Sequence, residues 1–344
     1  MTATLPPSQV PAVPAEEEKI SFKEIWTHPE PDMDEMVAIW LLITFGEEKF
    51  SGISNTEFLF KGAYDIKILG KSADDLEKEG ILCVGIGGGR FDEHPFGCDD
   101  KRKSGKSAAT LVADALELRD NPDVRNIIDF ASTVDLGSVT VDQYRDFLLD
   151  SLAKDSFRYT HKDDHYSIIQ AVFVLIGGKW RQNRSFMLCK NDFEKTSRCG
   201  YAVKQNGAKV KIVSVISDNL EMPKYCRSKW GGYAGVVIKI SPKTGKIQIL
   251  ADRQRLGGNL DPVARAVRIA ERQANGLRNR VPENQLVAEG EVEGADVWYY
   301  FPGGGMLFNS TPKNPNVPKT KLSREKVEQI VLDSLQLAFD NAGC

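Results

Sequence analysis

The sequence is poor in cysteine and carries almost no net charge, and each shortage excludes a class of protein. The six cysteines never form a Cys-x-x-Cys pair, which excludes the common zinc-finger arrangements, and no signal peptide precedes them. We therefore expect reduced thiols and a cytoplasmic protein. Because 45 Lys and Arg residues face 48 Asp and Glu, the net charge is only -3, which marks neither a nucleic-acid nor a membrane binder. Any site for a polyanion has to be local.

Long apolar stretches are also absent. The longest, such as residues 168–178, are shorter than the ~20 residues that a bilayer span requires, so no membrane association is expected. The composition is that of a globular protein, and 344 residues at ~150 per domain predict two domains with a ligand cleft between them. Residues 1–19 carry four prolines and three consecutive glutamates, and we expect them to form a disordered leader.

The first half of the chain alternates strand and helix patterns. A β-prone run at 20–27 precedes helical apolar spacing over 34–45, and an apolar run at 81–85 precedes a helix expected over 107–118. Further helical patterns cover 124–132, 141–152 and 165–176. This alternation is typical of an α/β fold, a parallel sheet with flanking helices, whose ligands bind beyond the carboxyl ends of the strands. We assign this domain to residues 20–178.

Near residue 208 the pattern changes to β-branched alternation. Strands are expected at 210–216, 236–240, 247–250 and 297–301, and helices at 262–273 and 324–339. These elements predict a smaller α+β domain over residues 208–344. The intervening residues 179–207 are polar and basic and show no clear period, which is typical of a linker.

One imidazole and four carboxylates gather in the turn after the first expected strand, where residues 27–35 read Thr-His-Pro-Glu-Pro-Asp-Met-Asp-Glu. Carboxylates gather this densely where something cationic balances them. A helix N-terminus offers about half a charge, whereas a divalent metal offers two. Two interpretations stand. Either His28, Asp32 and Asp34 hold metal, or Asp32 or Asp34 caps the helix that follows.

A second cluster follows the strand expected at 81–85. Residues 87–95 read Gly-Gly-Gly-Arg-Phe-Asp-Glu-His-Pro, so Asp92, Glu93 and His94 also stand at the carboxyl end of a strand. Two Asp/His clusters at the mouth of one sheet suit a two-metal site, which favours metal over capping. The glycines let the backbone approach a ligand closely, and a tight turn explains them as well.

The first cluster resembles the His-x-x-x-Asp-x-Asp signature that opens the DHH phosphoesterase superfamily, and Asp92-Glu93-His94 is similar to its Asp-His-His triplet. Asp135 stands where that family places a further metal-binding Asp. The Phe-Asp-x-His context resembles the melanocyte-proliferating-gene type of exonuclease within the superfamily. The resemblance covers about residues 20–140 by motif and the rest by architecture.

This resemblance implies a hydrolase in which two Mn²⁺ (or Mg²⁺) ions activate water against a phosphodiester or phosphoanhydride bond, as in a nuclease or nucleotide phosphodiesterase. The implied substrate contains phosphate, as an oligonucleotide, a nucleotide or a polyphosphate, and a homodimer is compatible with this activity. The implied metal ligands are His28, Asp32, Asp34, Asp92 and Asp135. The implied catalytic residues are Asp92, Glu93 and His94.

Two departures from the family pattern keep a second hypothesis open. Glu93 replaces the first histidine of the triplet, and the run 82–86 lacks the Asp that ends this strand in the family, for which Asp65 is a speculative substitute. Without this Asp, one of the two metal ions of the family is either missing or bound by other residues. The alternative is a catalytically degenerate protein that binds a nucleotide or phosphate or acts as a scaffold. A third hypothesis is that the acidic turn is purely structural.

For the C-terminal domain the resemblance implies a glycine-rich loop and basic residues that hold the far side of the substrate. The matching loop spans residues 300–310, although Met306 replaces the characteristic histidine, and a glycine turn between two strands explains the loop equally well. Arginine presents a fork that matches phosphate oxygens, while a solvated helix face is its commoner role. The substrate-binding candidates are Arg90, Arg265, Arg268, Gly303, Gly304, Gly305, Asn309 and Ser310.

Two stretches are locally basic. Residues 253–280 hold seven arginines against two acids, and residues 179–204 hold seven basic residues against two acids. Trp180, Trp230 and the aromatic run 298–300 are of the type that stacks on bases, although such residues more often pack in a core.

Overall fold

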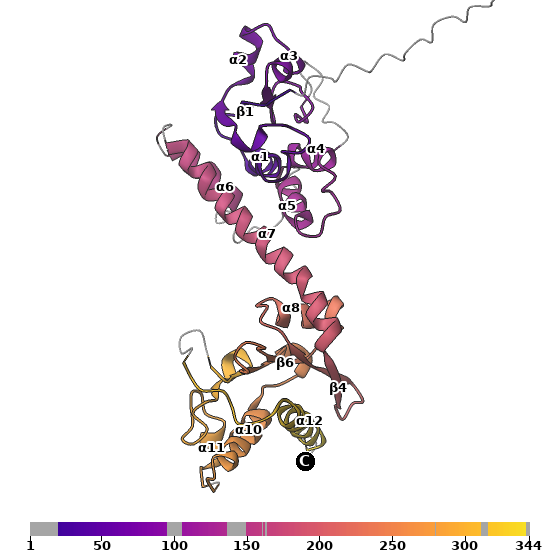
Figure 1. The fold of residues 1–344 in the computed structure, drawn as a ribbon, viewed down its shortest axis with the longest axis vertical. Coiled ribbons are helices and arrows are strands. Elements are labelled where there is room, and N and C mark those ends of the chain that lie inside the picture. Colours follow the sequence, from indigo (N-terminus) through magenta and orange to yellow (C-terminus); the bar gives the residue numbers. More distant parts are fainter. Residues whose placement is uncertain are drawn as a thin grey trace, which may run out of the picture. The chain divides into compact units, whose positions relative to one another are not determined.

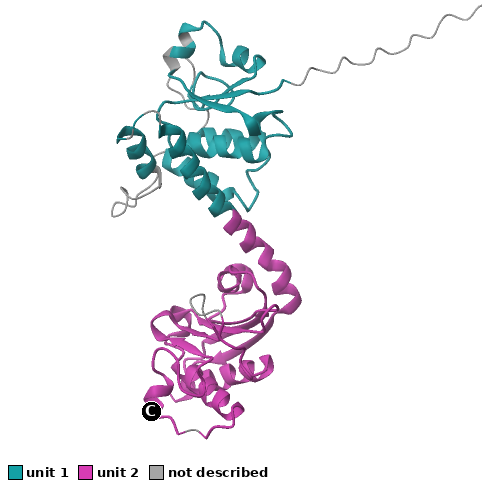
Figure 2. Ribbon diagram, turned by 60° about the vertical axis from the view of Figure 1, so that its left-hand side comes forward, with its two compact units in different colours: residues 1–180 teal, residues 181–344 magenta. Residues whose placement is uncertain are grey.

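The computed structural model describes residues 20–94, 105–135, 149–159, 161, 164–278, 280–310 and 316–341. They form two units whose boundary falls within one long helix, with unit 1 ending at Trp180 and unit 2 beginning at Arg181 (Figure 2). The leader expected at 1–19 and most of the helix expected at 141–152 lie outside the described residues. Among the helices that are described, none is both long and apolar enough to cross a membrane.

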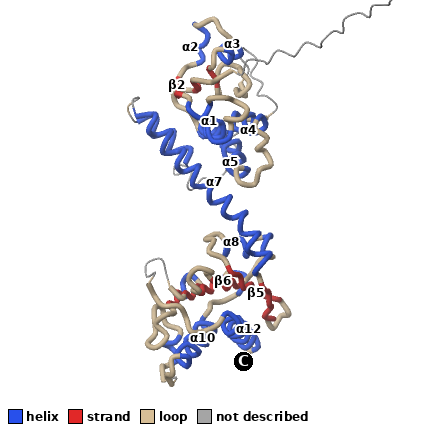
Figure 3. Tube along the Cα trace, viewed as in Figure 1, coloured by secondary structure: helices blue, strands red, loops and turns tan. Residues whose placement is uncertain are grey.

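The sheet of unit 1 consists of three parallel strands in the order β2-β1-β3. Figure 3 draws the strands in red and labels β2 of this sheet. The strands are β1 (Glu24–Thr27), β2 (Glu57–Phe60) and β3 (Ile81–Cys83). The parallel sheet confirms the α/β class, and β1 and β3 lie where the sequence predicts them. The sequence pattern missed β2, because four residues are too few to show a period. Since β1 is central, the chain that follows Thr27 emerges between the ends of its two neighbours.

Helices pack around this sheet (Figure 1), and one of them, α1, is buried along most of its length. Every residue of α1 from Met33 to Leu42 is buried, because α4 and α5 pack against it. Such all-round burial explains why α1 is apolar on every side rather than striped. The helices of unit 1 are α1 (Met33–Phe45), α2 (Ala63–Ile68), α3 (Ala73–Lys78), α4 (Ala108–Ala115), α5 (Arg125–Asp135) and α6 (Leu149–Tyr159).

Unit 2 contains a six-stranded mixed sheet in the order β4-β5-β6-β7-β9-β8. Its strands are β4 (Arg198–Val203), β5 (Lys209–Ile216), β6 (Val236–Ile240), β7 (Ile247–Ala251), β8 (Tyr299–Phe301) and β9 (Met306–Phe308). The β5–β6 pair is parallel and the other pairs are antiparallel. Alternate residues face opposite ways, so Ile212 and Ile238 join one core while Val213 and Val237 join the other.

Each face of this sheet is covered by helices. α10 (Asp261–Ala274) and α12 (Arg324–Asp340) cover one face, whereas α8 (Met222–Arg227) and the last part of α7 (His165–Thr196) cover the other. Ser323 caps α12 by accepting the backbone N–H of Lys326. Short helices α9 (Arg253–Leu256) and α11 (Glu283–Leu286) complete the unit.

The linker expected at residues 179–207 is regular structure instead. α7 continues to Thr196, twenty residues beyond the predicted end, and β4 occupies most of the remainder. Phe186, Cys189 and Phe193 pack against the sheet of unit 2 at a spacing of three and four residues. This period is helical, but the basic residues between these positions conceal it in the sequence.

Candidate metal centre

Two groups of potential metal ligands meet beyond the carboxyl ends of β1 and β3. Among the described residues, the ligand atoms of Asp34, Glu93 and Asp135 lie within 4.8 Å of one another, and so do those of Asp92, Glu93 and His94. Asp34 belongs to α1, residues 92–94 follow β3, and Asp135 is the last residue of α5. The fold therefore brings together five of the residues singled out in the sequence, and Glu93 belongs to both groups.

Glu93 is the most unusual side chain of the centre. It is 2% exposed, its Oε1 atom lies 3.1 Å from Nδ1 of His94, and its Oε2 atom has no hydrogen-bond partner among the described residues. Burial raises the pKa of Glu93, and the carboxylates of Asp135 and Asp92 raise it further, against a lowering by His94. Leaving a buried acceptor unsatisfied costs about 1–3 kcal/mol, and more for a charged group. A bound cation would remove this penalty.

Asp34 has two roles. Its Oδ2 accepts the backbone N–H of Ala108 at 2.5 Å and its Oδ1 that of Ala109 at 3.1 Å, so it caps α4 across 74 residues of chain. Burial raises the pKa of Asp34 to about 7, and Asp135 and Asp32 add to the shift. The Ser107 side chain also hydrogen-bonds this carboxylate, so only part of its acceptor capacity remains for a cation. Asp34 therefore caps α4 and not the helix that directly follows it, α1, whose predicted cap is provided by Asp32.

The glycine turn after β3 holds Asp92. The carboxylate of Asp92, which is 3% exposed, accepts the backbone N–H of Gly88 at 2.7 Å and that of His94 at 2.8 Å. Gly87 and Gly88 adopt φ angles of 80° and 73°, the left-handed region that favours glycine. The turn therefore fixes the orientation of the buried carboxylate, while His94 remains about half exposed at the rim.

His28 and Asp32 belong to neither ligand group of the described residues. Asp32 is the N-cap of α1, where its carboxylate accepts the N–H of Asp34 at 2.8 Å, and its Oδ2 lies 3.9 Å from Nζ of Lys154. Nε2 of His28 lies 3.8 Å from Oε1 of Glu35. Capping accounts for Asp32 without a metal, and its role as a ligand remains a prediction, as does that of His28.

Glu35 is a buried carboxyl group of this centre that has no individual role in the family signature. This side chain completes the capping box by accepting the backbone N–H of Asp32 at 2.9 Å, and it is 6% exposed. Burial raises the pKa of Glu35 well above its ordinary value, and the neighbouring Asp32 and Asp34 raise it further. A Cβ atom on Gly85 would lie 2.5 Å from Cγ of Glu35, so the glycine makes room for this carboxyl group. The position of Glu35 three residues after Asp32, which is the spacing of a capping box, is the sequence signal that indicates this role.

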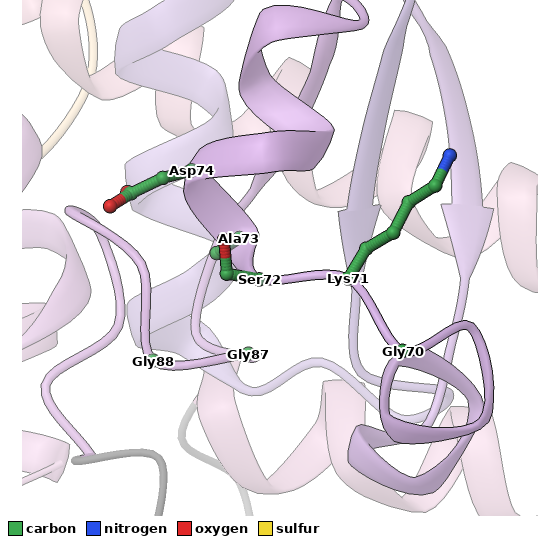
Figure 4. A pocket seen from close by; sticks show the side chains of 7 residues that line it. All are labelled: Gly70, Lys71, Ser72, Ala73, Asp74, Gly87 and Gly88. Carbon is green, nitrogen blue, oxygen red and sulfur yellow. The ribbon is translucent and has the colours of Figure 1, made fainter.

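The glycine turn also lines a pocket of about 350 Å³ together with residues 70–74 (Figure 4). The side chain of Lys71 points away from Gly87 and Gly88, and its ammonium group is bound to both carboxylate oxygens of Glu79 at 2.6 and 2.8 Å. Asp74 adds negative charge to the lining. The pocket is therefore poorly suited to a phosphate group.

Arg90, a predicted substrate contact, is already paired. Its Nη2 lies 2.7 Å from Oε1 of Glu77, and its Nε donates to Oε2 at 3.0 Å. The guanidinium carbon also lies 5.8 Å from the centre of the Phe50 ring. Binding a substrate phosphate would require Arg90 to release Glu77.

Arg268 is a core residue, which corrects its assignment to substrate binding. It is 0% exposed, and its guanidinium donates to the carbonyls of Leu286 and Ala288 at 2.9 Å each and to those of Gly290 and Trp298. Burial lowers the pKa of Arg268 to about 10. Because solvent does not reach this cation, it is not accessible to a substrate. Its hydrogen bonds instead hold residues 286–298 in place.

We expect Arg268→Met to destabilise unit 2 by ~3–5 kcal/mol, because four buried carbonyls lose their donor. Arg265, one turn earlier on α10, is the matched control, since it is half exposed and pairs with Glu283. Arg265→Met should change the free energy of unfolding by less than about 1 kcal/mol. Urea unfolding followed by circular dichroism measures both values, and equal effects of the two substitutions would contradict the structural role of Arg268.

The remaining candidates of unit 2 lie in or after the turn between β8 and β9. Gly303, Gly304 and Gly305 form this turn, and the carbonyl of Gly303 accepts a hydrogen bond from Arg253 at 2.9 Å. Asn309 is 0% exposed, with its amide donating to two backbone carbonyls and accepting one N–H, and Ser310 lies 3.4 Å from Nζ of Lys246. The structure thus favours the strand-to-strand turn for the glycines and a core role for Asn309.

Comparison with known proteins assigns no family. No family model matches the chain, and a search of the curated proteins found no match. The resemblance to the DHH superfamily therefore rests on the quoted motifs alone.

Proposed function

We propose that unit 1 binds divalent cations at the candidate metal centre and uses them to hydrolyse a phosphodiester or phosphoanhydride bond. The observation that carries this proposal is Glu93, which joins two ligand groups and keeps a buried carboxylate oxygen without a partner. A carboxylate shared by two groups suits a pair of ions held close together, the arrangement of two-metal hydrolases. Four carboxylates and one imidazole favour Mn²⁺ or Mg²⁺ over thiophilic metals.

The residues present fit such ions. Asp34, Glu93 and Asp135 would hold one, and Asp92, Glu93 and His94 the other. Bound there, the ions would lower the pKa of a coordinated water and neutralise charge on a phosphoryl group. His94, about half exposed at the rim, would leave the second ion within reach of solvent and substrate.

A second candidate function is binding without hydrolysis, and the capping geometry favours it. Asp34 already accepts two amides of α4, and Asp32 caps α1 while facing Lys154. Fewer lone pairs then remain for metal than the family signature implies. A protein of this kind would hold one ion and act as a nucleotide or phosphate sensor or as a scaffold.

Metal analysis separates the two functions. We expect the wild-type chain, after equilibration with Mn²⁺ and removal of free metal, to retain two ions and to hydrolyse bis-p-nitrophenyl phosphate. Asp135→Asn should retain one ion and lose at least ~100-fold in rate, because one ligand group loses a carboxylate. Glu48→Gln is the control, since Glu48 is exposed and lies outside both groups, and it should retain both ions. One ion without hydrolysis would favour the sensor, and no ion would refute the metal centre.

A further inference from the structure

One end of the unit 2 sheet carries exposed aromatic rings among cations. The strand registers place the first residues of β5, β6 and β9 at this end, together with the last residues of β4, β7 and β8. Trp230 and Tyr233 precede β6 and are each 53% exposed, while Arg253 and Arg255 follow β7. We call this end of the sheet, with the residues named below, the aromatic–basic surface.

The rings of Trp230 and Tyr233 each have a cation beside them. The guanidinium carbon of Arg255 lies 4.6 Å from the centre of the Tyr233 ring, and its Nη1 donates to the Tyr233 carbonyl at 3.2 Å. Nζ of Lys229 lies 4.9 Å from the Trp230 ring. Cations held in this way keep the rings in place while the exposed ring surface stays accessible.

Further basic side chains lie at the same end of the sheet. Nζ of Lys204 donates to the carbonyl of Arg255 at 3.0 Å, and Nζ of Lys211 donates to that of Gly231 at 3.0 Å. Arg253 donates to the turn between β8 and β9, next to the exposed ring of Phe301. Cations thus reach this end of the sheet from four separate segments of the chain, whereas the whole chain has a net charge of only -3.

Arg227, the last residue of α8, adds a further cation three residues before Trp230. Two of its guanidinium nitrogens, Nε and Nη2, are buried and have no hydrogen-bond partner among the described residues. Asp252, the nearby acid, already has its carboxylate bound to Nε of Arg255 at 3.1 Å. The local positive charge is therefore only partly compensated.

The backbone of Tyr233 is strained. Its φ of 60° lies in the left-handed region, which is unfavourable for a residue with a Cβ atom. Hydrogen bonds from Tyr233 N–H to the carbonyl of Ser228 and from Ala234 N–H to that of Cys226 hold this conformation. Since the ring is half exposed, the strain does not serve to bury it. It serves to present the ring to solvent beside Arg255.

We propose that the aromatic–basic surface binds single-stranded nucleic acid. Trp230 and Tyr233 stack on bases, while Arg253, Arg255 and Lys229 contact phosphates. Unpaired bases expose the flat faces that such rings recognise, whereas a duplex buries them. Binding by this surface is independent of the metal centre, and only the further step, that a single strand is the substrate of unit 1, rests on the proposed function.

The test uses the full chain in EDTA and a fluorescein-labelled oligothymidine of about 15 nucleotides, followed by fluorescence anisotropy. Binding should weaken with salt, with a slope of about -0.7 per phosphate contacted. Trp230→Ala and Tyr233→Gly should each weaken binding about five- to 100-fold. Glycine accepts the backbone angle of residue 233, so this variant removes the ring without adding strain.

Two matched controls leave the aromatic–basic surface intact. Tyr159→Ala removes a ring that is 88% exposed on unit 1, and Lys243→Ala removes an exposed cation from the turn between β6 and β7, at the opposite end of the sheet. Both should bind as the wild type does. Glu93→Gln should also bind in EDTA, and this result separates strand binding from the activity of the metal centre.

Three outcomes would overturn the proposal. The first is no binding of oligothymidine at low salt. The second is that the wild type binds a duplex of the same length as tightly as oligothymidine, while Trp230→Ala and Tyr233→Gly bind oligothymidine as tightly as the wild type does. This result would show a surface that binds any polyanion. The third is competition by polyglutamate as effective as that by unlabelled oligothymidine, which would identify an acidic protein as the partner.

Discussion

Glu93→Gln is expected to lose both metal ions, with the affinity for Mn²⁺ falling by at least ~100-fold at each site. Glutamine keeps the volume of the side chain but removes the charge that both ligand groups share, and it places an amide where Oε2 has no partner. Hydrolysis of a phosphodiester should fall with the metal. Isothermal titration with Mn²⁺ measures the loss directly.

The same substitution should leave the metal-free protein at least as stable as the wild type. A buried carboxylate facing other carboxylates is unfavourable, and its neutral isostere relieves this repulsion. Thermal unfolding in EDTA therefore separates loss of metal from loss of fold. Glu48→Gln, at an exposed position of unit 1, is the control and should match the wild type in both measurements. Two ions bound by Glu93→Gln with unchanged affinity would refute the shared-ligand geometry.

The metal-free protein is expected to become less stable as the pH rises from 4 to 8. Burial raises the pKa of Asp34 from 3.8 to about 7, so between these values the folded chain holds a proton that the unfolded chain has released. Asp34 alone should therefore lower the free energy of unfolding by up to about 4 kcal/mol as the pH rises through this window. Glu35 and Glu93, whose pKa values are also raised, contribute with the same sign.

Mn²⁺ should reverse this dependence, because the cation binds the ionised carboxylates and therefore binds more tightly as the pH rises. Urea unfolding at pH 5 and pH 8, in EDTA and in Mn²⁺, measures both slopes. Asp34→Asn is the informative variant, since asparagine can still accept one amide of α4 but does not titrate. Its metal-free slope should be clearly shallower, and a slope equal to that of the wild type would show that Asp34 is ionised throughout.

Local signals made much of unit 1 predictable. The strand at β3, the apolar spacing of α1 and the start of α4 near residue 107 are each encoded within a few neighbouring residues. The two acidic clusters could be placed at strand ends for the same reason, and the structure brings Asp34, Asp92 and Glu93 close together. Short-range periodicity and capping chemistry were sufficient for these features.

The remaining features depend on contacts between distant segments. No local pattern shows that Asp34 caps α4, that Glu93 lies between two ligand groups, or that Arg268 is buried among carbonyls. Charged residues are normally predicted at the surface, because burial without partners is unfavourable. The carbonyl partners of Arg268 come from 18 or more residues away, so the sequence pattern led to a wrong prediction of substrate binding for this residue.

The hydrogen bonds from Arg268 to four backbone carbonyls determine which sequence changes residues 286–298 can accept. The guanidinium donates hydrogen bonds to backbone oxygens at residues 286, 288, 290 and 298. Every amino acid supplies the same carbonyl, so the exposed Ala288 can be exchanged without disturbing the contact, whereas Leu286 and Trp298 are buried and Gly290 has a φ of 98°. Insertions and deletions are different, because they shift the carbonyls out of register with a fixed cation. The exposed positions of this segment can therefore change in composition while its length stays fixed, and a distant relative would be recognised there by the spacing of its few buried residues.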